Sequence, residues 1–85
     1  MKTKGDRLRD ACHEAVQAFK KINQPEFADI VSKLDFCIGS YNFDKNPVGL
    51  VEYGHVALEL LKEVKKTSPR KVSQTLIKKL EESLF

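Results

Sequence analysis

The sequence lacks most residues that mark special classes of protein. It has no tryptophan, two cysteines, three prolines and four glycines among 85 residues. Two cysteines are too few for the disulfide-dense scaffolds of small secreted proteins, and the spacing of Cys12 and Cys37 fits neither a zinc ribbon nor a redox CxxC pair. The low proline and glycine content, without a low-complexity stretch, excludes a disordered chain and favours a folded domain.

Long apolar runs are missing as well. No run approaches the roughly 18 residues that a membrane-spanning helix requires. The amino-terminal stretch MKTKGDRLRD is followed by an amphipathic pattern, not by the apolar core of a signal peptide. We therefore expect a cytoplasmic protein that does not contact a membrane. A chain of 85 residues has room for one domain, residues 1–85.

Motifs of common enzyme classes are absent too. There is no serine in a nucleophile elbow and no glycine-rich phosphate loop. The sequence thus indicates no catalytic residue and no cofactor, and it does not favour an enzyme.

Apolar residues recur at helical spacing in four segments. These segments span residues 6–22, 25–41, 47–66 and 74–84, and none alternates with the two-residue period of a half-buried strand. The pattern predicts an all-α bundle of four short helices. The third segment has the widest apolar arc, so we expect it at the centre, with the last helix laid across the others.

Capping residues support these boundaries. Pro25 and Pro47 stand at helix starts, where the missing N–H costs nothing, and Asn46 can cap the second of these starts. Ser73 can accept hydrogen bonds from the first amides of the last helix, and Val72 before it can pack on the following turn.

Two carboxylate and histidine pairs have the spacing that di-iron bundles use. Asp10 with His13 and Glu52 with His55 are three residues apart, but both carboxylates fall on polar helix faces. We expect solvated histidines, with a metal site as the alternative.

Cys12 and Cys37 fall at similar heights on the facing stripes of the first two predicted helices. We expect two buried free thiols that act as small hydrophobic groups. A disulfide or redox pair is the alternative, so a metal-dependent or redox protein is our third functional hypothesis.

Basic residues gather near the carboxyl end, although the net charge is only +3. Such a cluster can meet phosphate, or it can be a solvated face that aids solubility. The run VSQTLIKKLEE resembles recognition helices of helix-turn-helix repressors, which implies base contacts from its first polar side chains. The preceding KKTSPRKVS departs from that family, because it contains proline and exceeds the usual short turn. The basic residues are Lys62, Lys65, Lys66, Arg70, Lys71, Lys78 and Lys79.

A second apolar face lies on the second predicted helix. Phe36 and Phe43 are seven residues apart and point away from the predicted core stripe, with Gly39 and Ser40 between them. This face either packs beneath the last helix or meets another chain. We favour a non-catalytic protein-interaction module, in the form of a homodimer or of a complex with another protein. A nucleic-acid-binding protein is the alternative.

Overall fold

The computed structural model describes residues 3–84, and this part of the chain is all-α, without strands. Its elements are α1 (Lys4–Ile22), the 3₁₀ turn η1 (Pro25–Phe27), α2 (Ala28–Asp44), α3 (Val48–Thr67) and α4 (Gln74–Leu84). The predicted bundle of four helices is confirmed. Among the described residues, no helix is both long enough and apolar enough to cross a membrane.

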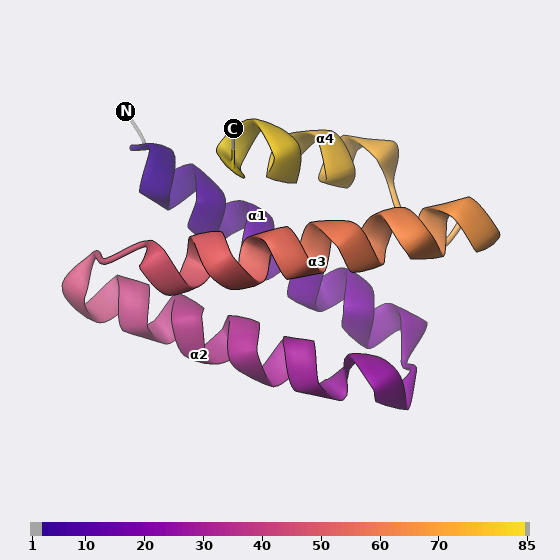
Figure 1. Cartoon of the computed structure of the whole chain (residues 1–85), viewed down its shortest axis with the longest axis horizontal. Helices are drawn as coiled ribbons and strands as arrows, with labels where there is room; N and C mark the ends of the chain where they lie inside the picture. The colour runs from indigo at the N-terminus through magenta and orange to yellow at the C-terminus, as the bar shows by residue number, and fades with distance from the viewer. Residues whose placement is uncertain (1–2, 85) are drawn as a thin grey trace.

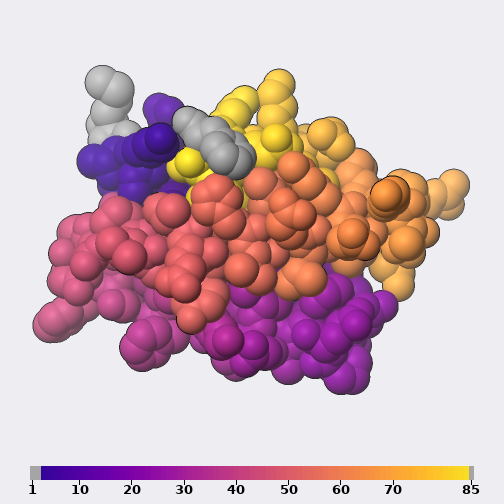
Figure 2. All heavy atoms as spheres, viewed as in Figure 1, coloured from indigo at the N-terminus to yellow at the C-terminus, as the bar shows by residue number. Residues whose placement is uncertain are grey.

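The four helices pack around a pair formed by α1 and α3. Each helix of this pair packs against all three of the others, while α2 and α4 lie on opposite sides of α3 (Figure 1). The third helix is central as expected, and α1 shares that position. One long face of α3 stays open at the front of the molecule (Figure 2), and α1 contributes as much to the centre.

The core is made of one apolar stripe from each helix. Phe19 and Phe27 lie in contact at its edge, with ring centroids 4.8 Å apart. The largest side chains with no exposed surface come from all four helices, so the helices share one core. These are Phe19 and Cys12 from α1, Leu34 from α2, Leu50 and Leu61 from α3, and Leu80 from α4.

The second helix is shifted by three residues from its prediction. Pro25 begins the short turn η1, and α2 itself starts at Ala28. At the other end α2 continues to Asp44, where Lys45 takes the left-handed conformation (φ 61°) and its N–H donates to the carbonyl of Tyr41 at 2.7 Å. This left-handed cap ends the helix. The sequence prediction relied on the turn preferences of single residues and placed the end of the helix too early.

Asn46 and Ser73 make the predicted side-chain hydrogen bonds, although α3 begins at Val48 with Pro47 at its N-cap position. Asn46 Oδ1 accepts from the amide of Val48 at 3.2 Å, while Asp44 Oδ1 accepts from the amide of Asn46 at 2.9 Å. Ser73 Oγ accepts from the amide of Thr75 at 3.1 Å. Three residues therefore suffice to turn the chain from α2 into α3.

The close contact between α2 and the start of α3 can be tested with two glycines. A Cβ on Gly49 would lie 2.8 Å from the Sγ of buried Cys37, whereas a Cβ on Gly39 would meet nothing within 4 Å. We expect Gly49→Ala to lower the free energy of unfolding by about 1 kcal/mol through overpacking. Gly39→Ala should raise it by roughly 0.5 to 1 kcal/mol, because alanine favours helix more than glycine.

Urea denaturation of both variants measures this pair of effects. Equal changes in the two variants would contradict the contact between Gly49 and Cys37.

Candidate protein interface

The outer face of α2 exposes two large aromatic side chains. Phe36 is 77% exposed and Phe43 is 92% exposed, on the side of α2 opposite the buried stripe. A spacing of seven residues brings them to the same face two turns apart, separated by about 10 Å along the axis. The edge of the molecule that α2 forms in Figure 2 is not covered by another helix. We call Phe36, Gly39, Ser40 and Phe43 the outer face of α2.

The sequence left two environments open for this face, and the structure excludes one of them. All four residues are exposed, and α4 packs on α1 and α3 instead. The suggestion that the face packs beneath the last helix was therefore wrong. Gly39 borders open space, so the surface between the two rings is free of other parts of the chain.

Three exposed valines on α3 add to the apolar surface. They are Val48, Val51 and Val56, with exposed fractions of 66%, 40% and 44%. The wide apolar arc of the third predicted segment includes Val51, so the prediction that this arc is buried was wrong at Val51. Val48 falls on the same side of the helix as Glu52 and His55, which could have indicated its exposure from the sequence.

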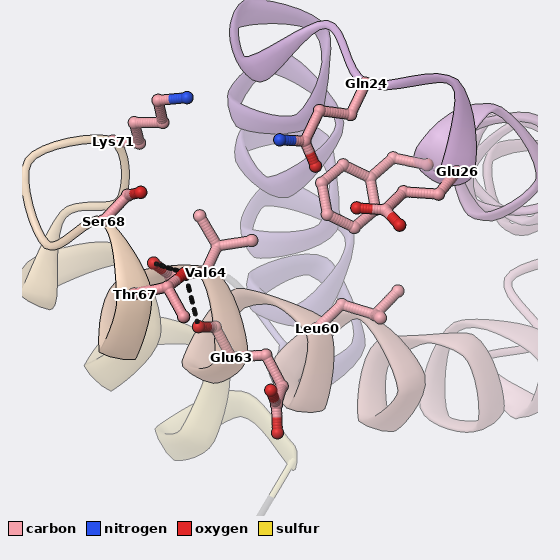
Figure 3. A pocket seen from close by; sticks show the side chains of 9 residues that line it. Gln24, Glu26, Leu60, Glu63, Val64, Thr67, Ser68 and Lys71 are labelled. Atoms are coloured by element: carbon pink, nitrogen blue, oxygen red, sulfur yellow. Dashed lines mark hydrogen bonds between the residues drawn. The ribbon is translucent and has the colours of Figure 1, made fainter.

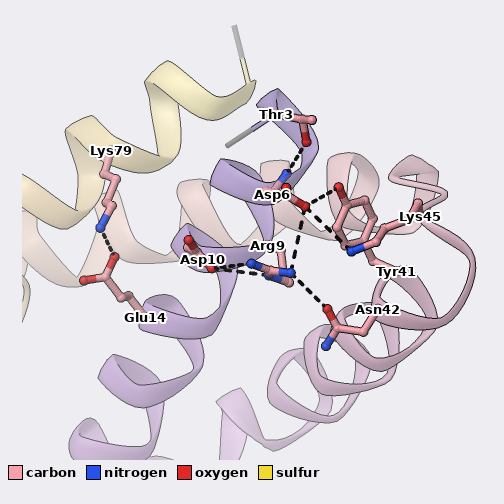
Figure 4. Close-up of polar contacts among 9 residues, drawn as sticks. All are labelled: Thr3, Asp6, Arg9, Asp10, Glu14, Tyr41, Asn42, Lys45 and Lys79. Carbon is pink, nitrogen blue, oxygen red and sulfur yellow. Dashed lines mark hydrogen bonds and ion pairs between the residues drawn. The ribbon is translucent and has the colours of Figure 1, made fainter. Parts of the chain in front are cut away.

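A polar network fixes the carboxyl half of α2 against α1 (Figure 4). Tyr41 donates its hydroxyl to Asp6 Oδ1 at 2.8 Å, and Arg9 donates to Asn42 Oδ1 at 3.2 Å. Asp6 also lies 3.8 Å from Arg9 and 4.0 Å from Lys45 in ion pairs. These contacts hold the turn of α2 that presents Phe43.

This network lowers the pKa of Asp6 below its ordinary value of 3.8. The hydrogen bond from Tyr41 is the main cause, and the nearby cations Lys45 and Arg9 act in the same direction, while desolvation opposes them. The ionised carboxylate is therefore the form that the fold favours.

The seven basic residues lie around more than one depression of the surface. Lys62, Lys65 and Lys66 line a depression between α3 and α4 together with Glu81, whereas Lys71 and Lys79 line another against α1. Arg70, in the α3–α4 loop, and Lys78, on α4, are exposed.

Two of the basic groups are engaged within the chain. Lys65 Nζ donates to the carbonyl of Val72 at 3.3 Å, and Lys79 Nζ pairs with Glu14 Oε2 at 2.7 Å (Figure 4). These contacts join α3 to the segment before α4, and α4 to α1. Binding of nucleic acid stays a prediction.

The two carboxylate and histidine pairs were the candidate metal ligands. In the described part of the chain no group of three or more histidine, cysteine, aspartate or glutamate side chains could hold a metal ion. His13 and Glu52 are exposed, and Asp10 accepts two hydrogen bonds from Arg9, with donor distances of 3.1 and 3.3 Å.

Both cysteines are free and buried, as expected. Burial raises the pKa of Cys12 to about 12, with a smaller contribution from neighbouring Cys37. Burial and, second, the charge of Glu52 raise the pKa of Cys37. Because only the thiolate is a good nucleophile, a raised pKa lowers the reactivity of both thiols.

The sequence did not indicate a hollow of about 410 Å³ between η1 and the end of α3 (Figure 3). Phe27, Leu60 and Val64 provide its apolar part, and the carboxylates of Glu26 and Glu63 stand at its rim. Its walls come from segments almost forty residues apart, so no local pattern could have revealed it.

No family model, no curated protein and no solved structure matches this chain.

The polar network predicts how stability depends on acid. The folded state lowers the pKa of Asp6. The contribution of Asp6 to the free energy of unfolding is therefore complete above pH 3.8, and it is lost as the pH falls through the lower pKa of the folded state. Tyr41→Phe keeps the ring but removes the hydroxyl, whose hydrogen bond is the main cause of the lowered pKa of Asp6. We expect an NMR titration of this variant to show the Asp6 pKa moving up towards 3.8.

Asp6→Asn is the matched control, because it keeps the side chain's shape without a titrating group. The free energy of unfolding of this variant should no longer show the acid dependence that Asp6 provides. An unchanged pKa of Asp6 in the Tyr41→Phe variant would show that the hydrogen bond from Tyr41 is not the main cause of the lowered pKa.

Proposed function

We propose that the chain is a non-catalytic helical module that binds another polypeptide through the outer face of α2. The observation that supports this most is the exposure of Phe36 and Phe43 on one helix face. Burying a phenylalanine stabilises a complex by about 1.5 to 3 kcal/mol, so two adjacent rings are a strong apolar anchor. Aromatic side chains are also enriched among the residues that dominate binding energy at interfaces.

The surroundings of the two rings favour binding over a structural role. The core is complete without them, since each helix already buries its own apolar stripe. The polar network fixes the end of α2 that holds Phe43, so this part of the surface is ordered before a partner arrives. A preordered surface loses less conformational entropy on binding.

Whether the exposed rings serve binding and not folding can be tested by replacing one exposed and one buried phenylalanine. Phe36→Ser should change the free energy of unfolding by no more than about 0.5 kcal/mol, because the side chain is exposed. Phe19→Ala should lower it by roughly 3 to 5 kcal/mol, because that ring is in the core. Urea denaturation gives both values. A large loss of stability in Phe36→Ser would assign that ring to the fold.

Binding itself is tested by photo-crosslinking in the cells from which the chain comes. With benzoylphenylalanine in place of Phe36 we expect covalent adducts with a polypeptide, either another protein or a second copy. The same group at His13, which is exposed on α1, should give none. The absence of polypeptide adducts from position 36 would overturn the proposal.

Salt distinguishes the nucleic-acid alternative. Apolar contacts should hold when salt is raised from about 50 to about 200 mM, whereas phosphate contacts should weaken steeply. Light scattering of the purified chain with duplex DNA at both concentrations measures this. A DNA complex that dissociates with salt would favour the basic residues as the site.

A further inference from the structure

We propose that the hollow between η1 and the end of α3 binds a short peptide of apolar residues whose two termini are free. This is a second site, and it does not depend on the outer face of α2. The hollow has a volume of about 410 Å³. Sites for small ligands have volumes of about 300 to 1,000 Å³, so this hollow suits a ligand at the small end of that range, such as a dipeptide.

The floor of the hollow is apolar. Phe27 is buried, and its ring packs on the ring of Phe19, so the core fixes its position. Leu60 and Val64 lie one turn apart on α3 and are only partly buried. Part of their apolar surface therefore meets water in the hollow. An apolar side chain of a ligand would remove that surface from water.

The rim has opposite charges on its two sides (Figure 3). The carboxylate of Glu26 extends from η1 towards the hollow, and the ammonium group of Lys71 extends from the α3–α4 loop towards Gln24. Ser68 lies on the same side as Lys71. The amide of Lys71 donates to the carbonyl of Ser68 at 3.0 Å, which closes the turn that holds both residues. A ligand's amino terminus thus fits at Glu26, and its carboxylate fits at Lys71 and Ser68.

An amide group lies between the two charges. The side chain of Gln24 points into the space between Glu26 and Lys71 in Figure 3. It contains an N–H donor and a C=O acceptor, which are the groups that pair with a peptide bond. The apolar floor, the two opposite charges and the central amide together match the parts of a short peptide with free termini.

The polar groups of the rim are available to a ligand. Within the described residues, the side chains of Gln24, Glu26, Ser68 and Lys71 make no hydrogen bond or ion pair with the rest of the chain. The hydroxyl of Thr67, by contrast, donates to carbonyls of its own helix at 3.3 Å. Charge complementarity therefore favours a zwitterionic ligand over one with a single charge.

Four small ligands test the chemistry on the full chain. NMR titration with leucyl-leucine should shift the amide signals of residues 24–27 and 60–68. Acetylation of its amino group, or amidation of its carboxylate, should each weaken binding about two- to fivefold, because each removes one exposed ion pair. Glycyl-glycine keeps both charges but has no apolar side chains, so it should bind about tenfold more weakly or worse.

Two glutamates provide a matched pair of variants. Both are exposed and line the hollow, but the side chain of Glu63 points away from it in Figure 3. Glu26→Gln should bind leucyl-leucine and its acetylated form equally, because the partner of the amino terminus is lost. Glu63→Gln should keep the preference for the free amino terminus. Circular dichroism confirms that both variants are folded.

The lysines allow the same comparison for the other terminus. Lys71→Gln should bind leucyl-leucine and its amide equally. Lys66→Gln should keep the preference for the free carboxylate, because Lys66 is exposed on α3 and lines a different depression.

Three outcomes would overturn the inference. These are no shifts around the hollow at millimolar leucyl-leucine, equal binding of all four ligands to the wild-type chain, and equal effects of Glu26→Gln and Glu63→Gln. None of these measurements involves Phe36 or Phe43. The hollow and the proposed function therefore succeed or fail separately.

Discussion

The burial of the apolar stripe of α1 against three other helices is the constraint on which this structure depends. Ala11 and Ala15 have no exposed surface, and their small side chains let neighbouring helices approach closely. α1 packs against α2, α3 and α4, so each later helix is placed by the same stripe. The removal of this surface from water is the main driving force for assembling so short a chain.

Polar contacts then fix the angle and height at which the helices meet. The hydroxyl of Tyr41 reaches Asp6 across α1 and α2, while the ammonium of Lys79 reaches Glu14 across α4 and α1. These bonds lie at the edges of the core, where burial alone leaves helices free to slide. The first also orders the end of α2, so the fold and the candidate interface share a support.

The same packing decides which surfaces are left for function. Once α2 buries Leu34 and its stripe against α1 and α3, its opposite face must lie outside the bundle. The basic residues are divided by the placement of α4, because Lys79 turns towards α1 while Lys62 and Lys66 line the α3 side. The two exposed rings therefore lie on one helix face, while basic residues line depressions on two sides of α4.

The sequence by itself determined the four helices, most of their buried stripes and the caps at Asn46 and Ser73, because helical periodicity and capping depend on residues within a few turns. It also identified Phe36 and Phe43 as a face separate from the core. Only the tertiary structure decided that this face is exposed, that α1 shares the centre with α3, and that the hollow beside Phe27 exists. A helical wheel specifies which side of one helix is apolar, but which neighbour covers that side depends on contacts between residues far apart in the chain.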